Sequence, residues 1–248
     1  MEKEGEKKEN ALAVKVDGLV KIIGSKIIVD EVSFEVKKGE IFGLLGGNGS
    51  GKTTIFNMLS GVIEPSSGEV HVSGYSMRER KKLLHTIGFV TQENTVYETL
   101  TVKENLEYFA AEYGAKKGEN IKKLLEDVEL YEKRDSLAGS LSGGMKRRLN
   151  IACSLVHNPE LVFLDEPTVG LDPATRRGIW RLVKKLHESG KTVILTSHYM
   201  DEVEALCERV VLVFRGRIVA EGSPQELKSR FGLTMDDLFE KFTREGKS

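Results

Sequence analysis

A glycine-rich loop at residues 46–53 places the strongest constraint on what this chain can fold into. It directly follows a continuous apolar run at 41–45, which is typical of a strand buried on both faces. The next residues, 53–59, have the apolar spacing of a helix. Strand, glycine loop and helix form the context in which the pattern G-x-x-x-x-G-K-[ST] binds phosphate groups. The sequence therefore predicts a phosphate-binding loop within an α/β domain.

Each residue type in this loop has a chemical reason to be there. Glycines allow successive backbone N–H groups to point at one anion, and the following helix N-terminus adds partial positive charge. Lys52 can reach the β- and γ-phosphates of a nucleotide, and the Thr53 hydroxyl is placed to ligate Mg²⁺. A glycine turn with a surface lysine is the alternative, and the agreement of strand, loop and helix argues against it. The expected cofactor-binding residues are Gly46, Gly47, Asn48, Gly49, Ser50, Gly51, Lys52, Thr53 and Thr54.

A second feature is an acidic pair that ends another apolar run. Residues 161–164 are Leu-Val-Phe-Leu, and Asp165 and Glu166 follow directly. In open α/β sheets ligands bind at the carboxyl edge of the strands, where these carboxylates would lie. Asp165 is a candidate for the Mg²⁺ shell, and Glu166 can accept a proton from an attacking water. A surface Asp-Glu pair ahead of a proline turn is the alternative reading.

The rest of the chain alternates strand and helix patterns. Strands are predicted around 11–16, 27–36, 69–72, 87–90, 192–195 and 210–219, and helical spacing runs from about 102 to 157. Helix starts are indicated by Ser142, by Asp172 before a proline, and by Ser223 in a capping box. This order predicts a mainly parallel α/β core with an antiparallel β N-terminal subdomain and an inserted α-helical subdomain.

The predicted organisation has three parts. Residues 1–10 form a charged, solvated tail, residues 11–222 form the nucleotide-binding domain, and residues 223–248 form a C-terminal helical extension. Within the domain, 11–91 and 158–222 form the core, and about 92–157 form the helical insert.

Composition excludes several classes of protein. Lys plus Arg (37) nearly equals Asp plus Glu (38), so the net charge of -1 gives no electrostatic signature of a nucleic-acid partner. No apolar run is long enough to span a membrane, and the first ten residues do not resemble a signal peptide. The apolar run around Cys153 indicates a buried thiol, consistent with a reducing compartment. We therefore expect a cytoplasmic protein, held at a membrane only by a partner.

Residues 141–148, Leu-Ser-Gly-Gly-Met-Lys-Arg-Arg, narrow the choice among phosphate-loop nucleotidases. They resemble the signature motif of the ATP-binding cassette (ABC) ATPases. Residues 161–167 resemble the Walker B segment of that family, 169–172 its D-loop, 196–198 its switch-histidine segment and 91–93 its Q-loop. These motifs occur in the family's order, and the resemblance extends from about residue 11 to residue 221.

The resemblance implies a mechanism in which ATP and Mg²⁺ are cofactors. Lys52 and Thr53 would bind phosphate and metal, Gln92 would sense the metal and the attacking water, Glu166 would be the general base and His198 would contact the γ-phosphate. In this family, Ser142, Gly143 and Gly144 face the ATP of a second subunit, and Asp172 lies in the D-loop. Taken singly, several of these residues have simpler explanations, such as a solvated Gln92 or an Asp172 that only caps a helix. Their joint order favours the family roles.

Three positions depart from the family pattern. Ile23 stands where an aromatic ring usually stacks on adenine, which puts adenine selectivity in doubt. Met145 stands where the signature usually has glutamine, which weakens only a polar contact. Gly47 stands where many relatives have proline, which should loosen the loop slightly.

One cassette without a long coiled-coil insertion leaves two functions open. The first is the ATPase of a transporter that pairs with an identical or different ABC subunit and an integral membrane subunit. The second is a soluble ABC ATPase of an assembly pathway. Residues 99–109 and 222–228, and the Met-Lys-Arg-Arg end of the signature, resemble ABC-2-type exporter ATPases, and we therefore prefer an exporter. Val96, Tyr97 and Leu100 would then receive a helix of the membrane partner; the alternative is that they close the core of the insert.

Overall fold

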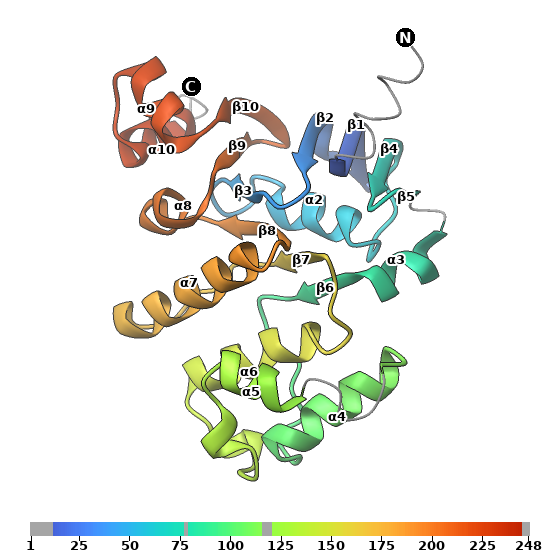
Figure 1. Ribbon diagram of the computed structural model, residues 1–248. Coiled ribbons are helices and arrows are strands. Elements are labelled where there is room, and N and C mark those ends of the chain that lie inside the picture. The colour runs from blue at the N-terminus through green and yellow to red at the C-terminus, as the bar shows by residue number, and fades with distance from the viewer. Residues whose placement is uncertain (1–11, 77–78, 116–120, 245–248) are drawn as a thin grey trace.

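The computed structural model describes residues 12–76, 79–115 and 121–244, and within them the strands form two sheets (Figure 1). The predicted N-terminal tail lies outside the described residues. A four-stranded antiparallel sheet has the order β2-β1-β4-β5, and a six-stranded sheet has the order β10-β9-β3-β8-β7-β6. The strands are β1 (Leu12–Ile23), β2 (Lys26–Lys37), β3 (Ile41–Leu45), β4 (Ser67–Val72), β5 (Tyr75–Ser76), β6 (Ile87–Val90), β7 (Leu161–Leu164), β8 (Thr192–Ser197), β9 (Arg209–Phe214) and β10 (Arg217–Gly222).

The six-stranded sheet is parallel from β9 to β6, and only β10 runs antiparallel to its neighbour. Its central strands are buried on both faces, because successive side chains enter two different hydrophobic clusters. In β7, Val162 and Leu164 pack on one face of the sheet and Leu161 and Phe163 on the other. This alternation explains why the strands read as unbroken apolar runs in the sequence.

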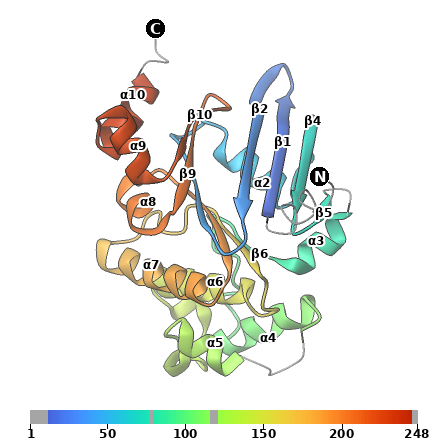
Figure 2. The same ribbon diagram turned by 45° about the horizontal axis from the view of Figure 1, so that its top comes forward.

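Helices cover both faces of this sheet. Helix α2 (Lys52–Leu59) packs on one face and lies between the two sheets, where Phe56 meets Phe163 edge to face with ring centroids 5.4 Å apart. On the other face lie α7 (Pro173–Glu188) and α8 (Met200–Leu206), whose buried residues share one cluster with β7 and β8. Figures 1 and 2 show α2 and α7 separated by the parallel sheet.

The helical region predicted between the strands contains α4 (Val102–Glu112), α5 (Ile121–Asp127) and α6 (Gly143–Ser154), with two short 3₁₀ turns, Tyr131–Lys133 and Ala138–Ser140. The helix starts indicated by Ser142, Asp172 and Ser223 are all present, and each side chain accepts a hydrogen bond from a backbone N–H of the first turn. The last helices of the described residues are α9 (Pro224–Phe231) and α10 (Met235–Arg244), which pack on each other through Phe231 and Phe242.

Sequence patterns missed two helices, α3 (Arg80–Thr86) and α8. Each is only seven residues long and begins at a residue whose side chain makes no capping hydrogen bond, so neither offers a periodic run or a start signal. Among the described residues, no helix combines the length and the apolar character needed to cross a membrane.

Arg209 joins the two sheets. Its guanidinium donates to both carboxylate oxygens of Glu40, at 2.8 and 3.1 Å, and to the Glu35 carbonyl of β2 at 2.5 Å. It also pairs with Glu221 and lies over the Phe42 ring, 4.9 Å from its centroid. Because Glu40 is only 8% exposed, this ion pair is partly desolvated. Loss of the Arg209 side chain would leave the buried Glu40 carboxylate without its cation.

We therefore expect Arg209→Ala to lower the free energy of unfolding by about 2–3 kcal/mol. The matched control is Arg217→Ala, which removes an arginine that is 70% exposed and pairs with Asp30, and should cost less than about 1 kcal/mol. Guanidinium chloride denaturation of the three proteins measures both values. If both variants lose the same free energy of unfolding, burial of the Arg209–Glu40 ion pair adds nothing to its contribution.

Candidate nucleotide-binding site

The residues predicted to bind phosphate and metal and to act in hydrolysis follow strands that end at one edge of the parallel sheet. Four neighbouring strands, β3, β8, β7 and β6, end there. The glycine loop follows β3, residues 165–166 follow β7, His198 follows β8 and Gln92 lies just after β6. Parallel pairing brings the carboxyl ends of these strands together, so segments more than 100 residues apart in the sequence form one site.

The backbone of the glycine loop has the shape of an anion cradle. Gly49 and Gly51 have φ values of 76° and 105°, a region that glycine adopts without strain. A Cβ at Gly46 would lie 2.5 Å from both Ser50 Oγ and the Val213 carbonyl oxygen, so only glycine fits there. Helix α2 begins at Lys52 without a side-chain cap, so the N–H groups of its first turn are free to bind an anion.

Two further observations fit a phosphate ligand. Ser50 Oγ is buried and has no hydrogen-bond partner among the described residues, and it faces the same loop. The Lys52 ammonium is buried and donates to the carbonyls of Gly46 and Gly47 at 2.6 and 3.1 Å. Burial lowers the pKa of Lys52, and the carboxylates of Glu166 and Asp165 oppose that shift. At the start of α2, Thr53 is exposed and accessible to a metal ion.

The acidic pair after β7 is held by a short hydrogen-bonded chain. Thr196 Oγ1 donates to Asp165 Oδ1 at 2.5 Å and accepts from the Glu166 N–H at 2.9 Å. Burial raises the pKa of Asp165, although the hydrogen bond from Thr196 opposes the shift. Glu166 Oε1 lies 3.8 Å from Lys52 Nζ, and Glu166 Oε2 lies 3.2 Å from His198 Nδ1. That buried nitrogen completes no hydrogen bond among the described residues, which leaves it able to bind a ligand or Glu166.

A buried carboxylate that sequence reasoning missed supports the His198 segment. Glu202 of α8 is 1% exposed and accepts hydrogen bonds from Thr168 at 2.8 Å, Trp180 at 3.0 Å and Ser197 at 2.7 Å. Burial raises the pKa of Glu202, and the three donors favour its ionised form. It thus connects the segment before the D-loop with the residue just before His198. No sequence signal marks it, because its donors come from three separate segments.

The other predicted residues lie at or beyond the margins of this cluster. The Gln92 side chain is exposed, as is Ile23, 56% exposed at the tip of the β1–β2 hairpin. Ser142 and Gly143 are exposed at the start of α6, and Figure 1 places α6 with α4 and α5, well away from α2. The structure therefore does not bring these two residues to the glycine loop of the same chain.

Gly144 instead lies against the N-terminus of α7. A Cβ at Gly144 would lie 2.2 Å from Thr175 Cγ2, so glycine allows the two helices to approach. Thr175 also donates to Asp172 at 2.5 Å, and Asp172 accepts the N–H groups of Ala174 and Thr175. The signature segment and the D-loop therefore form one surface.

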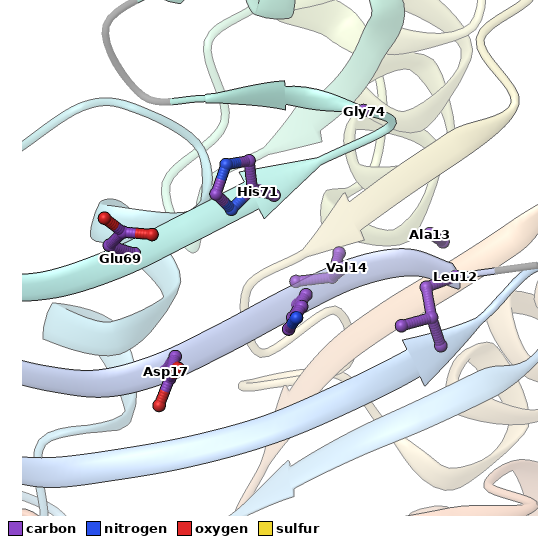
Figure 3. Close-up of a pocket in the computed structure, with 8 residues that line it drawn as sticks. Leu12, Ala13, Val14, Asp17, Glu69, His71 and Gly74 are labelled. Atoms are coloured by element: carbon purple, nitrogen blue, oxygen red, sulfur yellow. The ribbon is translucent and has the colours of Figure 1, made fainter. Parts of the chain in front are cut away.

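A hollow on the antiparallel sheet is a different feature of the molecule. It is lined by residues of β1 and by Glu69, His71 and Gly74 of β4 and the turn after it (Figure 3). It contains none of the motif residues and mixes acidic with basic side chains. The nucleotide chemistry therefore does not lie there.

The ABC transporter family model matches residues 29–169. The chain is 46% identical over 223 residues to the linearmycin resistance ATP-binding protein LnrL of Bacillus subtilis (strain 168), covering 88% of this chain and 72% of that protein. It is 43% identical over 233 residues to the Nod factor export ATP-binding protein I of Rhizobium sp. (strain N33), covering 92% and 77%. With YbhF of Escherichia coli (strain K12) it shares 42% identity over 216 residues, 86% of this chain but only 37% of that longer protein.

Among solved structures, an ATP-binding subunit of an ABC transporter superimposes with a TM-score of 0.84 at 27% identity, covering 93% of this chain and 99% of the other. The fold and the site define a P-loop ATPase. The chain belongs to the ABC transporter family: it binds ATP and couples its hydrolysis to transport.

The fit of glycine at position 46 gives a test of the cradle. Gly46→Ala should weaken ADP binding at least about tenfold, a change of about 1.4 kcal/mol, because the new methyl group displaces Ser50 or Val213. Val62→Ala is the control, since Val62 is 45% exposed and lies outside the loop and the other predicted site residues. Titration with a fluorescent ADP analogue measures both affinities, and unchanged binding to Gly46→Ala would show that the loop tolerates a side chain there.

Proposed function

We propose that this chain is the Mg²⁺-dependent ATPase subunit of an ABC exporter, which works as a dimer on a separate membrane subunit. Residues 11–222 would form the cassette, with a helical insert at about 92–157 and a C-terminal extension at 223–248. The observation that carries the proposal is the convergence of the glycine loop, Asp165, Glu166 and His198 at one sheet edge. The names of the relatives, one of which is a Nod factor export protein, support the exporter direction.

The proposed metal ligands are Thr53, Asp165 and Gln92. The exposed hydroxyl of Thr53 and the carboxylate of Asp165 offer the hard oxygen ligands that Mg²⁺ prefers. Gln92, on the loop after β6, would complete the set through its side-chain oxygen. When bound, Mg²⁺ neutralises charge on the phosphate oxygens. Lys52 and the N–H groups of 46–54 would hold those oxygens.

Glu166 is the proposed general base. Its carboxylate lies within 4 Å of Lys52 and His198, so an ammonium and an imidazole flank the position where a water would be activated. His198, whose Nδ1 completes no hydrogen bond among the described residues and lies 3.2 Å from Glu166 Oε2, would contact the γ-phosphate. Glu166→Gln should keep ATP binding and lose turnover by about 10²-fold or more, because an amide cannot accept the proton.

The measurement is phosphate release under saturating ATP, with the oligomeric state followed by size-exclusion chromatography. We expect Glu166→Gln to accumulate as an ATP-bound dimer, because the step that releases the dimer is blocked. Turnover at the wild-type rate in that variant would remove Glu166 as the base.

The proposed dimer follows from the position of the signature segment. Ser142, Gly143 and Gly144 lie at the start of α6, whose N–H groups form a second anion-binding end, and Figure 1 shows α6 away from α2 of the same chain. Their ligand would be the ATP of a second subunit, in an arrangement that also brings Asp172 to the interface. The second subunit is an ABC ATPase, either identical or related.

An exposed aromatic patch supports a membrane partner. The patch consists of Tyr97, Tyr108 and Phe109; Tyr97 and Tyr108 are 45% and 40% exposed, and their ring centroids are 4.7 Å apart. Val96, Tyr97 and Leu100 are the residues expected to dock a partner helix. Tyr97 lies in the patch and Leu100 is half-buried, whereas Val96 packs against the core of the chain, as the alternative expects. Exposed aromatic clusters are typical of binding surfaces. A docked membrane subunit would hold the protein peripherally at the cytosolic face of the membrane.

Tyr108→Glu tests this docking against the assembly-pathway alternative. It places a charge in the patch and should reduce co-purification with a polytopic membrane protein by at least about tenfold, because loss of a hot-spot aromatic costs about 2 kcal/mol or more. Val62→Glu is the control, since Val62 is exposed to a similar degree (45% against 40% for Tyr108) and lies outside the patch. Pull-down from native membranes with quantitative mass spectrometry measures the ratio. Recovery of the unaltered chain with soluble partners alone would exclude the exporter.

A further inference from the structure

Arg147 occupies an unusual position for an arginine. It lies in the second turn of α6, six residues beyond the start of the signature motif, and is only 4% exposed. Its guanidinium donates five hydrogen bonds, all to backbone carbonyl oxygens. The acceptors are Thr91 at 2.6 Å, Gln92 at 3.2 Å, Asp165 at 2.8 Å, Glu166 at 3.2 Å and Pro167 at 2.9 Å. We call this set the carbonyl clamp.

The carbonyl clamp joins three parts of the catalytic site. Two of its acceptors follow β6, three follow β7, and the donor belongs to the helix that begins with the signature segment. Carbonyl dipoles that converge on one point repel one another, so this arrangement of the two loops requires a cation at its centre. Among the described residues Arg147 forms no ion pair, so the carbonyls are its direct partners. Burial lowers its pKa to about 10, which leaves it charged at neutral pH.

The backbone of Glu166 shows what the carbonyl clamp holds. Glu166 has a φ of 43°, in the left-handed region that a residue with a side chain adopts at a cost of about 1–3 kcal/mol. Such a conformation persists only where the surroundings determine it. Here Thr196 Oγ1 accepts the Glu166 N–H, and Arg147 donates to the Glu166 carbonyl. The two contacts fix the peptide groups on both sides of the Cα, and this aims the carboxylate at Lys52 and His198.

We propose that Arg147 is a positioning residue for hydrolysis: it holds the backbone of Glu166, together with the segment carrying Gln92, in the reactive geometry, and ties both to the signature helix. The inference rests on the proposed role of Glu166. Lysine cannot replace this arginine, because a compact ammonium has three donors and no planar fork, whereas the carbonyl clamp uses five bonds in fixed directions.

The first test compares Arg147→Lys and Arg147→Gln with Arg148→Lys. Arg148 is the next residue on α6 but pairs with the exposed Glu129 outside the site, so it is a matched control. In the purified full chain, both Arg147 variants should lower kcat by about 10- to 100-fold, the size of effect that a misplacement of about 1 Å produces, while KM for ATP changes less than about threefold. Arg148→Lys should stay within about twofold of the wild-type kcat.

Three results would overturn the proposal. A wild-type kcat in Arg147→Lys would show that the fork is not needed. A loss confined to KM would show that Arg147 supports nucleotide binding rather than the reactive geometry. If thermal melting shows that neither Arg147 variant folds, the residue supports the fold as a whole.

A second test separates this inference from the assignment of the base. If Arg147 acts through Glu166, the double variant Arg147→Lys/Glu166→Gln should be no slower than Glu166→Gln alone, because the group being positioned is already absent. A further loss as large as that seen in the wild-type background would show that Arg147 does not act through Glu166, which overturns the proposal. Turnover at the wild-type rate in Glu166→Gln alone is a separate result, which would show that Glu166 is not the general base.

Discussion

The parallel pairing of β3 with β8, and of β8 with β7, is the constraint on which the site depends. Because the strands run in one direction, their carboxyl ends share an edge, and each following loop delivers one kind of group: N–H donors after β3, carboxylates after β7 and an imidazole after β8. Burial on both faces leaves these strands little freedom to slip, since a shift of one residue would exchange the two hydrophobic clusters. The precision of the site thus comes from the packing of apolar side chains that take no part in the chemistry.

Buried charge is the cost of this arrangement. Four charged side chains of the site are less than 6% exposed, namely Lys52, Asp165, Glu202 and Arg147. Burial lowers the pKa of the two cations and raises the pKa of the two carboxylates, so it favours the neutral form of each group. Hydrogen bonds favour the charged form of each group: carbonyls accept from the two cations, and hydroxyl or indole groups donate to the two carboxylates. The same low dielectric that disfavours the charges strengthens these bonds. The buried charges of the site are thus each held by hydrogen bonds, whereas Thr53, Gln92 and Ser142, which are proposed to contact ligands, are exposed.

Much of this could be predicted from the sequence, because the signals were local. Each of these signals involves only a few neighbouring residues: the apolar run before the glycine loop, the acidic pair after 161–164, and the capping residues Ser142 and Asp172. The structure has the corresponding strands and helices. The carbonyl clamp could not be predicted, since its acceptors are backbone atoms that carry no residue identity. Glu202 was missed for a related reason: its donors are an ordinary threonine, serine and tryptophan brought together only by the fold. Helices α3 and α8 depend on tertiary packing rather than on their own periodicity.

The expected phosphate contacts and the expected base contact, Ile23, lie in different surroundings. The loop at 46–53 is enclosed by β3, α2 and the Arg215–Gly216 turn, whose Gly216 N–H donates to the Ser50 carbonyl at 2.8 Å. Ile23, by contrast, projects from the hairpin tip beside Ile22 and Ile27, and all three are about half exposed. Aliphatic side chains offer a base apolar area but no stacking face, so their contribution scales with the area covered and not with the electronic structure of the ring. The affinity for nucleotide should therefore arise mainly at the phosphates, where the contacts are directional. The base should contribute little affinity, and the chain should discriminate weakly between purine bases.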